Sequence, residues 1–432
     1  MIFFIWVIYF LFVYLTYKQI KLTSISQMGI SFGALLGLVF FLAIPLFFIF
    51  LEGELSDPGI FIEPYLPFED LVTTSNIFIG WSVVLLASMY EVNVIDKSNR
   101  EINIKEYVES KKLLYFIICV YFIITIVTTI TTGAFGEGVH WHDSSRNESS
   151  FFIIFKNFSN CYRVVVFGLI LYLLNQGKVN RSKSIYIAVA FTVFDVLLSF
   201  NRITLLYFLL FFILSHRKYA LLIFSSIVVV IPPVIYISSV WTWFRGMASI
   251  SGIGFDSYLK SWNDAVILYE SVGDRFVVKM NSIFESSNIL VFHGLVEKVG
   301  DSIPIFYGST YLVRPLTTFI PSTIWPDKPQ VFGTYIGLYI NNYEGLALNS
   351  TLFGEAYSNF MYFWPFVLLV TLMALTKLYS TASKYVYSIN LMSIFIGVSI
   401  WRFDMNFTIA CVYSLIFIIF ITKFFGSKRL KF

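Results

Sequence analysis

Charged residues are scarce in this chain of 432 residues, of which Asp, Glu, Lys and Arg together make up only 13%. A soluble globular domain carries about 25% charged residues, so this chain has too few to cover a water-facing surface. A soluble enzyme is therefore excluded. Disordered and fibrous structures are excluded as well, because 57% of the residues are hydrophobic and 19% are aromatic. With a mean hydropathy of +0.77, the composition predicts a polytopic membrane protein.

Cysteine is also rare, and the motifs of several common enzyme classes are missing. The three cysteines, Cys119, Cys161 and Cys411, each lie within an apolar run, so no disulfide framework is expected. The chain has no G-x-x-x-x-G-K-[ST] loop, no H-E-x-x-H and no G-x-S-x-G. No cofactor is therefore expected, and a metal ion is neither required nor excluded. The net charge of +4 is scattered along the chain, which argues against a nucleic-acid partner.

Apolar runs that could cross a bilayer dominate the sequence. A hydrocarbon core of about 30 Å needs roughly 20 apolar residues per helix. We expect about eleven such spans, at residues 1–17, 29–51, 71–90, 113–135, 158–176, 185–200, 202–215, 219–240, 361–379, 386–401 and 405–425. The first is interpreted as a retained span, because it lacks the basic start and the cleavage site of a signal peptide. Asn201 and Arg202 interrupt the stretch 185–215, and the charge pattern favours two short spans that meet at Arg202.

The distribution of Lys and Arg predicts the orientation of the spans. These residues cluster in alternate connections, at 18–28, 91–112, 177–184, 216–218, 377–385 and 423–432, whereas the acidic loop 52–70 has none. By the positive-inside rule, the N-terminus lies outside and the C-terminus inside. Residues 241–360 then form one long outer loop between an N-terminal bundle (1–240) and a C-terminal bundle (361–432).

The outer loop has three distinct parts. Apolar residues recur at helical spacing over 258–272 and again over 276–284, so we expect two amphipathic helices at the membrane surface. Four prolines between 315 and 329 prevent a regular helix in the next part. In the last part, Glu355 and Asn359 would share one face at the mouth of the following span.

The basic residues outside these connections lie on the outer side, against the usual bias, and most of them are arginines. An Arg in or near the hydrocarbon costs about 2.5–3.5 kcal/mol on insertion scales, so a group of them suggests a compensating anion. The planar guanidinium grips phosphate oxygens with two parallel hydrogen bonds. Asp195, within one of the short runs, is expected to face the bundle interior. The arginines are Arg146, Arg163, Arg202, Arg245, Arg275, Arg314 and Arg402.

Three segments in the last 130 or so residues carry specific motifs. They read GSTYLVRPLTTFIPSTIWPDKP at 308–329, GEAYSNF at 354–360 and WRFD at 401–404. These segments resemble the bacterial O-antigen (oligosaccharide repeat-unit, Wzy-type) polymerase family, in which an outer loop carries a P-x-x-I-W-P-x-K-P-like segment. In that family a G-E-x-Y-x-N-F-like segment then opens a span, and an R-x-D follows late in the chain. The spans and the long outer loop extend the resemblance over most of the chain.

The resemblance implies a fold similar to the polyprenyl-donor membrane glycosyltransferases (GT-C-like) and a place in the bacterial inner membrane. It implies transfer of a growing glycan from undecaprenyl pyrophosphate to a terminal hydroxyl of the next lipid-linked repeat unit, on the periplasmic side. Its partners would be these lipid-linked oligosaccharides, membrane lipid and a chain-length regulator. Two alternatives stay open. One is an O-antigen ligase of similar topology, and the other is a lipid-linked oligosaccharide flippase, for which two similar halves would be expected.

This chemistry needs cations where the leaving pyrophosphate gains charge and a base for the acceptor hydroxyl. Glu355 is the candidate base, and Arg314 and Arg245 are the candidate catalytic cations. His293 is a weaker candidate, because the related ligases are expected to use an outer-loop histidine. The candidate substrate-binding residues are Arg163, Arg202, Arg275, Tyr311, Trp325, Lys328, Tyr357, Asn359, Arg402 and Asp404. Structural alternatives are helix capping for Glu355, pairing with Arg402 for Asp404, and a turn position for Lys328. They are ion pairing or snorkelling for the arginines, and interfacial anchoring for the aromatic residues.

Overall fold

The chain folds as an assembly of helices. The computed structural model describes residues 1–57, 59–101, 111–132, 150–199, 202–216, 236–241, 243–244, 247, 255–271, 285–318, 320, 324–342, 347–383 and 388–413. Within these residues there is no β-strand, and only two isolated bridges join Leu55 to Tyr65 and Val299 to Ile303. The all-α fold class predicted from the sequence is confirmed.

Two compact units divide the chain. Unit 1 combines Met1–Val108 with Ser286–Phe432, and unit 2 is Glu109–Glu285. Unit 2 is thus inserted in the sequence of unit 1. These boundaries follow three-dimensional packing, whereas the predicted division into 1–240, 241–360 and 361–432 follows membrane topology and stays a prediction.

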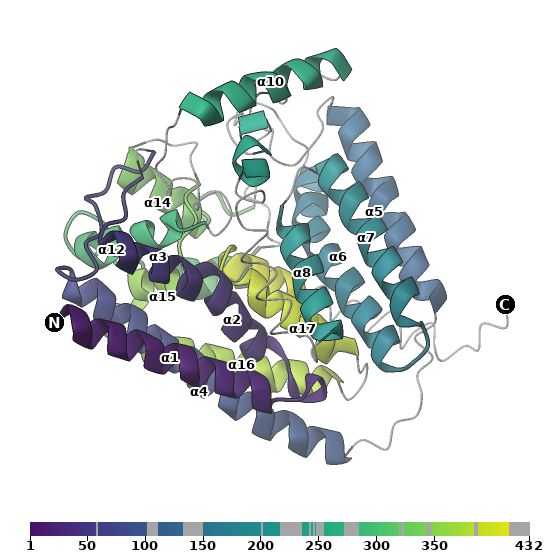
Figure 1. Ribbon diagram of the computed structural model, residues 1–432, viewed down its shortest axis with the longest axis horizontal. Helices are drawn as coiled ribbons and strands as arrows, with labels where there is room; N and C mark the ends of the chain where they lie inside the picture. Colours follow the sequence, from purple (N-terminus) through teal and green to yellow (C-terminus); the bar gives the residue numbers. More distant parts are fainter. Residues whose placement is uncertain are drawn as a thin grey trace. The chain divides into compact units, whose positions relative to one another are not determined.

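Unit 1 contains most of the described helices, which are labelled in Figure 1. The N-terminal part holds α1 (Ile2–Leu22), α2 (Ile30–Leu38), a π-helical turn (Val39–Ala43), α3 (Ile44–Glu52) and α4 (Leu71–Glu101). The C-terminal part holds α12 (Ser287–Lys298), a second π-helical turn (Ser309–Val313), α13 (Arg314–Leu316), α14 (Phe332–Asn341), α15 (Leu352–Phe360), α16 (Trp364–Ser383) and α17 (Ser388–Ser399).

Four helical stretches in the described part of the chain are long and apolar enough to cross a membrane. They are Ile2–Leu22, Ile30–Glu52, Leu71–Ile95 and Leu352–Ser383, and they coincide with the spans predicted at 1–17, 29–51, 71–90 and 361–379. Shorter apolar helices at Leu114–Val127, Cys161–Asn175, Ile203–Ser215 and Ile389–Ser399 coincide with four more. These helices are typical of a membrane protein, and the total of about eleven spans stays a prediction.

Unit 2 contains a bundle of four helices that pack against one another (Figure 1): α5 (Lys111–Thr132), α6 (Ser150–Asn175), α7 (Arg181–Ser199) and α8 (Ile203–Ser215). Arg202 directly precedes α8, so the stretch 185–215 forms two helices as the sequence predicts. The first predicted amphipathic helix is also present, as α10 (Phe255–Ser271), and its Ala265 packs in a buried cluster with Val240 and Phe244. The second, over 276–284, lies outside the described residues.

A close helix crossing joins α2 to α17 in unit 1. A Cβ atom added at Gly33 would lie 2.0 Å from the carbonyl oxygen of Ile394, and one added at Gly397 would lie 2.0 Å from that of Ile30. Because these neighbours are backbone atoms, only glycine fits at either position. The two backbones therefore meet directly, as in the small-residue crossings of membrane helices.

A buried carboxylate from α4 caps the start of α2. The side chain of Glu91 accepts backbone N–H groups from Gly29 at 3.0 Å, Ser31 at 2.9 Å and Phe32 at 2.8 Å. It also accepts the hydroxyl of Thr376 in α16 at 3.0 Å. The first N–H groups of a helix have no partner within the helix, so Glu91 satisfies several of them at once and ties three helices together.

Candidate functional site

Helix α15 places two of the predicted site residues on one buried face. Thr351 caps its start by accepting the Gly354 N–H at 3.3 Å. Glu355 and Asn359, one turn apart, are 3% and 1% exposed. The Asn359 amide donates to the backbone carbonyl of Glu355 and to the hydroxyl of Thr310, both at 2.8 Å. The segment that starts at Gly308 is therefore attached directly to α15.

The carboxylate of Glu355 is held on one side only. Its Oε2 accepts the backbone N–H of Met405 at 2.8 Å, at the start of the helical stretch 405–413. Its Oε1 is buried and has no hydrogen-bond partner. Glu355 therefore does not cap its own helix, since Thr351 does, but supports the start of another. The free Oε1 is oriented and available to accept a proton.

Asp404 is the second carboxyl group of the site. Its Oδ1 caps the same helical stretch by accepting the Phe407 N–H at 3.3 Å. Burial raises the pKa of Asp404 to about 6, against the opposing effects of that hydrogen bond and of the positive charge of Arg314. Glu355 and Asp404 lie within electrostatic range of each other, so the two acids share one environment.

Arg314 directly follows the second π-helical turn, as the first residue of α13, and interacts electrostatically with Asp404. Gly308 opens this turn with a φ of 81°, a left-handed conformation that favours glycine. The guanidinium is half-buried, and burial lowers its pKa while the charge of Asp404 opposes that shift. Its Nε is buried without a hydrogen bond, and no ion pair within 4.0 Å joins Arg314 to a carboxylate of the described residues. The cation is thus within electrostatic range of the Asp404 carboxylate without an ion pair to it.

Further contacts join the motif segments. The Thr318 hydroxyl donates to Asn406 Oδ1, and the Tyr413 hydroxyl donates to the Leu316 carbonyl at 3.4 Å. Together with the Thr310–Asn359 and Glu355–Met405 bonds, these contacts assemble all three resembling segments in one place. We call Arg314, Glu355, Asn359 and Asp404 the acid–arginine cluster.

Lys328 has a structural position in this region. Its ammonium donates to the backbone carbonyls of Ile320 at 2.8 Å and Thr318 at 3.1 Å. Burial, followed by the positive charge of Arg314, lowers the pKa of Lys328 to about 8. The side chain therefore supports the proline-rich loop.

The predicted aromatic and polar binding residues are placed differently. Tyr311 is buried, and its hydroxyl lies near Thr371 without a hydrogen bond of normal geometry. Tyr357 packs edge-on against Phe292, which makes it part of the core. Trp325 is half-buried in the loop. The guanidinium of Arg402 lies 5.7 Å from the ring centre of Phe403.

An open aromatic surface lies beside Asn359. A shallow depression of about 500 Å³ is lined by Ile305, Tyr307, Asn359, Phe360, Met361, Tyr362 and Phe363. Tyr307 and Tyr362 are 81% and 85% exposed. Exposed aromatic rings suit either a membrane interface or the faces of sugar rings.

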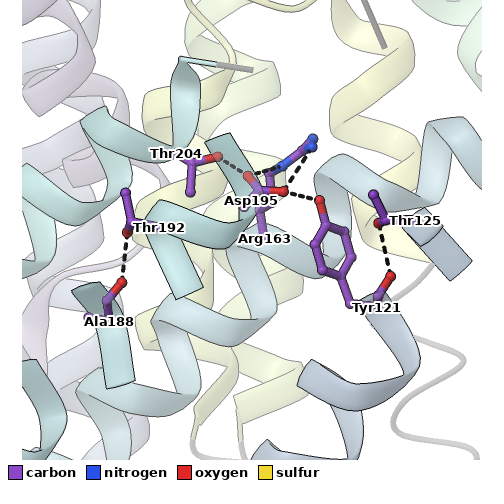
Figure 2. A network of polar contacts seen from close by, with 7 residues as sticks. All are labelled: Tyr121, Thr125, Arg163, Ala188, Thr192, Asp195 and Thr204. Carbon is purple, nitrogen blue, oxygen red and sulfur yellow. Dashed lines mark hydrogen bonds and ion pairs between the residues drawn. The ribbon is translucent and has the colours of Figure 1, made fainter. Parts of the chain in front are cut away.

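The arginines of unit 2 are held by other groups. Arg163 is fully buried and forms a two-point ion pair with Asp195, with Nε–Oδ2 at 2.8 Å and Nη2–Oδ1 at 3.2 Å. Figure 2 shows that the hydroxyls of Tyr121 and Thr204 donate to the same carboxylate, so one network joins α5, α6, α7 and α8. Arg202 donates to the backbone carbonyl of Ser238 at 3.3 Å and to its hydroxyl at 2.9 Å. The predicted site residues Arg245 and Arg275 lie outside the described residues.

Two features of these sites were not found by sequence reasoning. The partner of Arg163 is Asp195, which lies 32 residues away on another helix. The position of Asp195 within an apolar run was the only indication of an interior role. Side chains that could ligate a metal gather elsewhere in unit 1, around His293. The signal for these was the spacing of His293 and Glu297, which share a helix face.

Comparisons of the chain with protein-family models, curated proteins and solved structures give no match in any of the three. The functional argument therefore depends on the motifs and on the geometry of the acid–arginine cluster.

Proposed function

We propose that the chain is an O-antigen polymerase of the bacterial inner membrane. It would extend a glycan held on undecaprenyl pyrophosphate by transfer to a terminal hydroxyl of the next lipid-linked repeat unit. The observation that supports this proposal is the convergence of segments 308–329, 354–360 and 401–404, which are separate in sequence and resemble that family. They are joined through Thr310, Glu355 and Asn359 and through Met405 and Asn406, which directly follow the third segment. Nothing in the packing of a purely structural helix junction requires a buried carboxylate oxygen and a buried guanidinium nitrogen without partners.

The arrangement suits the reaction at the level of bonds and protons. The acceptor hydroxyl oxygen attacks the anomeric carbon of the donor, and the bond between that carbon and the pyrophosphate oxygen breaks. Glu355 Oε1 takes the hydroxyl proton, while its Oε2 stays fixed by Met405. Arg314 stabilises the charge that develops on the leaving pyrophosphate, an effect worth about 3–4 kcal/mol for a preorganised donor.

Asp404 and the aromatic depression have supporting roles in this proposal. Ionised Asp404 orients Arg314 by electrostatic attraction. The exposed rings of Tyr307 and Tyr362 offer flat apolar faces for sugar or lipid next to Asn359. The proposed active site faces the periplasm, with the N-terminus outside and the C-terminus inside.

Deletion of the gene followed by gel electrophoresis of the lipopolysaccharide tests this function. We expect the ladder of long chains to collapse to a single repeat unit on the core, and a plasmid copy of the gene to restore it. Bare core would instead indicate the ligase or flippase alternative, and an unchanged ladder would contradict all three functions.

Labelling of single cysteines tests the orientation. The three native cysteines are first replaced, and a cysteine is then placed at exposed Asp301. A membrane-impermeant maleimide should label this site in intact spheroplasts, whereas a cysteine at Lys183, in a predicted inner connection, should react only after the membrane is opened. The reverse pattern would contradict a periplasmic active site.

A further inference from the structure

Three side chains with metal-ligating atoms converge in unit 1, outside the acid–arginine cluster. His293 and Glu297 lie one turn apart on α12, and Asp70 directly precedes α4. One ligand atom from each lies within 4.8 Å of the other two. We infer that Asp70, His293 and Glu297 form a binding site for a single divalent transition-metal ion of the Zn²⁺ type.

The distances fit a shared ion better than direct pairing. His293 Nε2 lies 3.5 Å from Glu297 Oε1 and 3.7 Å from Asp70 Oδ2, whereas N–H···O hydrogen bonds measure about 2.7–3.2 Å. Two ligands of one tetrahedral zinc ion, each about 2.0–2.2 Å from the metal, are separated by roughly 3.3–3.6 Å. The two distances from the nitrogen are therefore at or just above the separation of ligands around one ion, and the two carboxylate oxygens lie within 4.8 Å of each other.

The other nitrogen of the imidazole is already engaged. His293 Nδ1 lies 2.9 Å from the hydroxyl of Thr73, and the ring packs against Tyr65 with the ring centres 5.2 Å apart. A metal-bound histidine commonly has its second ring nitrogen held in this way, which fixes the direction of the ligating nitrogen. His293 is 1% exposed, so the side chains packed around the ring hold its Nε2 toward the carboxylates.

The charges of the site favour a cation. Asp70 and Glu297 bring two carboxylates, and Asp70 Oδ2 accepts only the Leu66 N–H, at 2.7 Å, from the described residues. The positive charge of Lys298 also acts on the ring, and the two carboxylates outnumber it. His, Asp and Glu match the ligand set of zinc sites that keep a fourth position open.

An ion here would brace the scaffold of the acid–arginine cluster. It would tie the start of α4 to α12, and α12 packs on α15 through the edge-on contact of Phe292 with Phe353. The ion is thus assigned a structural role, and the inference does not depend on the proposed polymerase activity.

Metal content of the purified full-length protein tests the site. The protein is prepared in detergent, stripped with EDTA, incubated with Zn²⁺, freed of excess ion on a desalting column and subjected to elemental analysis. We expect one zinc ion per chain and a higher midpoint of thermal unfolding with zinc than without it. Glu297→Gln should weaken zinc binding at least tenfold, and Thr73→Val by about 10- to 100-fold, the range for partners of a ligating histidine.

Matched variants decide the outcome. Glu69→Gln changes an exposed acid next to Asp70 and should bind zinc as the wild type does. Asp70→Asn and His293→Ala should not retain the ion. Should the buried His293 variant fail to fold, Glu297→Gln still decides, because the Glu297 side chain is 41% exposed. A wild-type protein that retains no zinc, retention of Ca²⁺ in place of zinc, or equal zinc in the wild type and Glu297→Gln would each overturn the inference.

Discussion

Glu355 accepts the backbone N–H of Met405 at 2.8 Å across 50 residues of sequence. This bond joins the segment that opens the span Leu352–Ser383 to the last described helical stretch. It fixes one oxygen of the carboxylate and leaves the other, Oε1, buried and without a partner. A glutamine in the same place would keep the accepting oxygen and lose the proton-accepting charge, which makes it a selective probe of the site.

Glu355→Gln should abolish long O-antigen chains while leaving the protein in the membrane. A general base contributes about 10²- to 10⁴-fold to rate, so polymer formation in an assay with lipid-linked repeat units should fall by that factor. Arg314→Ala should reduce it by about 10²- to 10³-fold through loss of charge stabilisation. Glu69→Gln and Lys377→Ala, which change exposed side chains, serve as controls. Normal ladders from both site variants, at equal protein level by immunoblot, would show that the site is wrongly placed.

The Arg163–Asp195 pair should be essential to the stability of unit 2. Removal of one partner of a buried ion pair leaves an unpaired charge and costs about 3–5 kcal/mol. We expect this loss for Arg163→Met and for Asp195→Asn in denaturant unfolding of the protein in detergent. Asparagine keeps one acceptor oxygen for one of the two hydroxyls, of Tyr121 or Thr204, which donate to different oxygens of Asp195. The double variant removes both charges, so it should recover part of the loss. Strictly additive losses in the double variant would mean that the two residues do not interact. As a control, Arg181→Met, at an exposed position, should change the free energy of unfolding little.

The glycines of the α2–α17 crossing should tolerate no side chain. At Gly33 a Cβ would fall 2.0 Å from a backbone oxygen, so Gly33→Ala must push the helices apart. Overpacking of this kind costs about 1–3 kcal/mol, and we expect an equal or larger loss for Gly397→Ala. The measure is the midpoint of unfolding in a mixed-micelle titration. Gly59→Ala is the control, because the nearest atom there is the flexible carboxylate of Asp57 at 3.3 Å. A similar loss in this variant would contradict the claim that backbone contact at the crossing causes the effect.

The raised pKa of Asp404 should make stability depend on pH. In the folded chain this pKa is about 6, against 3.8 for an unperturbed aspartate, so the folded state binds the proton more tightly than the unfolded state. The resulting stabilisation is complete below about pH 4 and is lost as the pH rises through about 6. Asp404→Asn should therefore flatten the decline of the thermal midpoint between pH 4 and pH 6. Asp301→Asn, at an exposed position, should keep the wild-type slope, and an unchanged slope in Asp404→Asn would contradict the assignment.

Helix positions and the shared face of Glu355 and Asn359 could be predicted from the sequence because their signals are local. Long apolar runs predict α1, α2 and α4, and the break at Arg202 follows from two polar residues in such a run. The i, i+4 spacing predicts that Glu355 and Asn359 share a face. Their proximity to Arg314 and Asp404 was suggested only by the resemblance, because no local pattern reports contacts across 50 to 90 residues.

Partners distant in sequence could not be predicted. Glu91 was assigned to a basic connection, yet its carboxylate caps α2 from 60 residues away. The sequence leaves Arg163 open between a substrate contact and a structural ion pair, and the structure pairs it with Asp195. In both cases a buried charge needs a specific counterpart, and the residue that supplies it is decided by how helices pack. Composition limits the kind of partner but not its identity.

The crossing of α2 and α17 also has a consequence for biosynthesis. Residues 30–38 leave the ribosome before unit 2, whereas the helix at 388–399 is translated after all of unit 2. The backbone surface around Gly33 therefore stays without its partner helix, in the translocon or the lipid, while about 350 more residues are synthesised. A nascent chain that stops before α17 would present this uncovered surface to membrane quality control, so premature termination even late in translation should lead to degradation of the whole product.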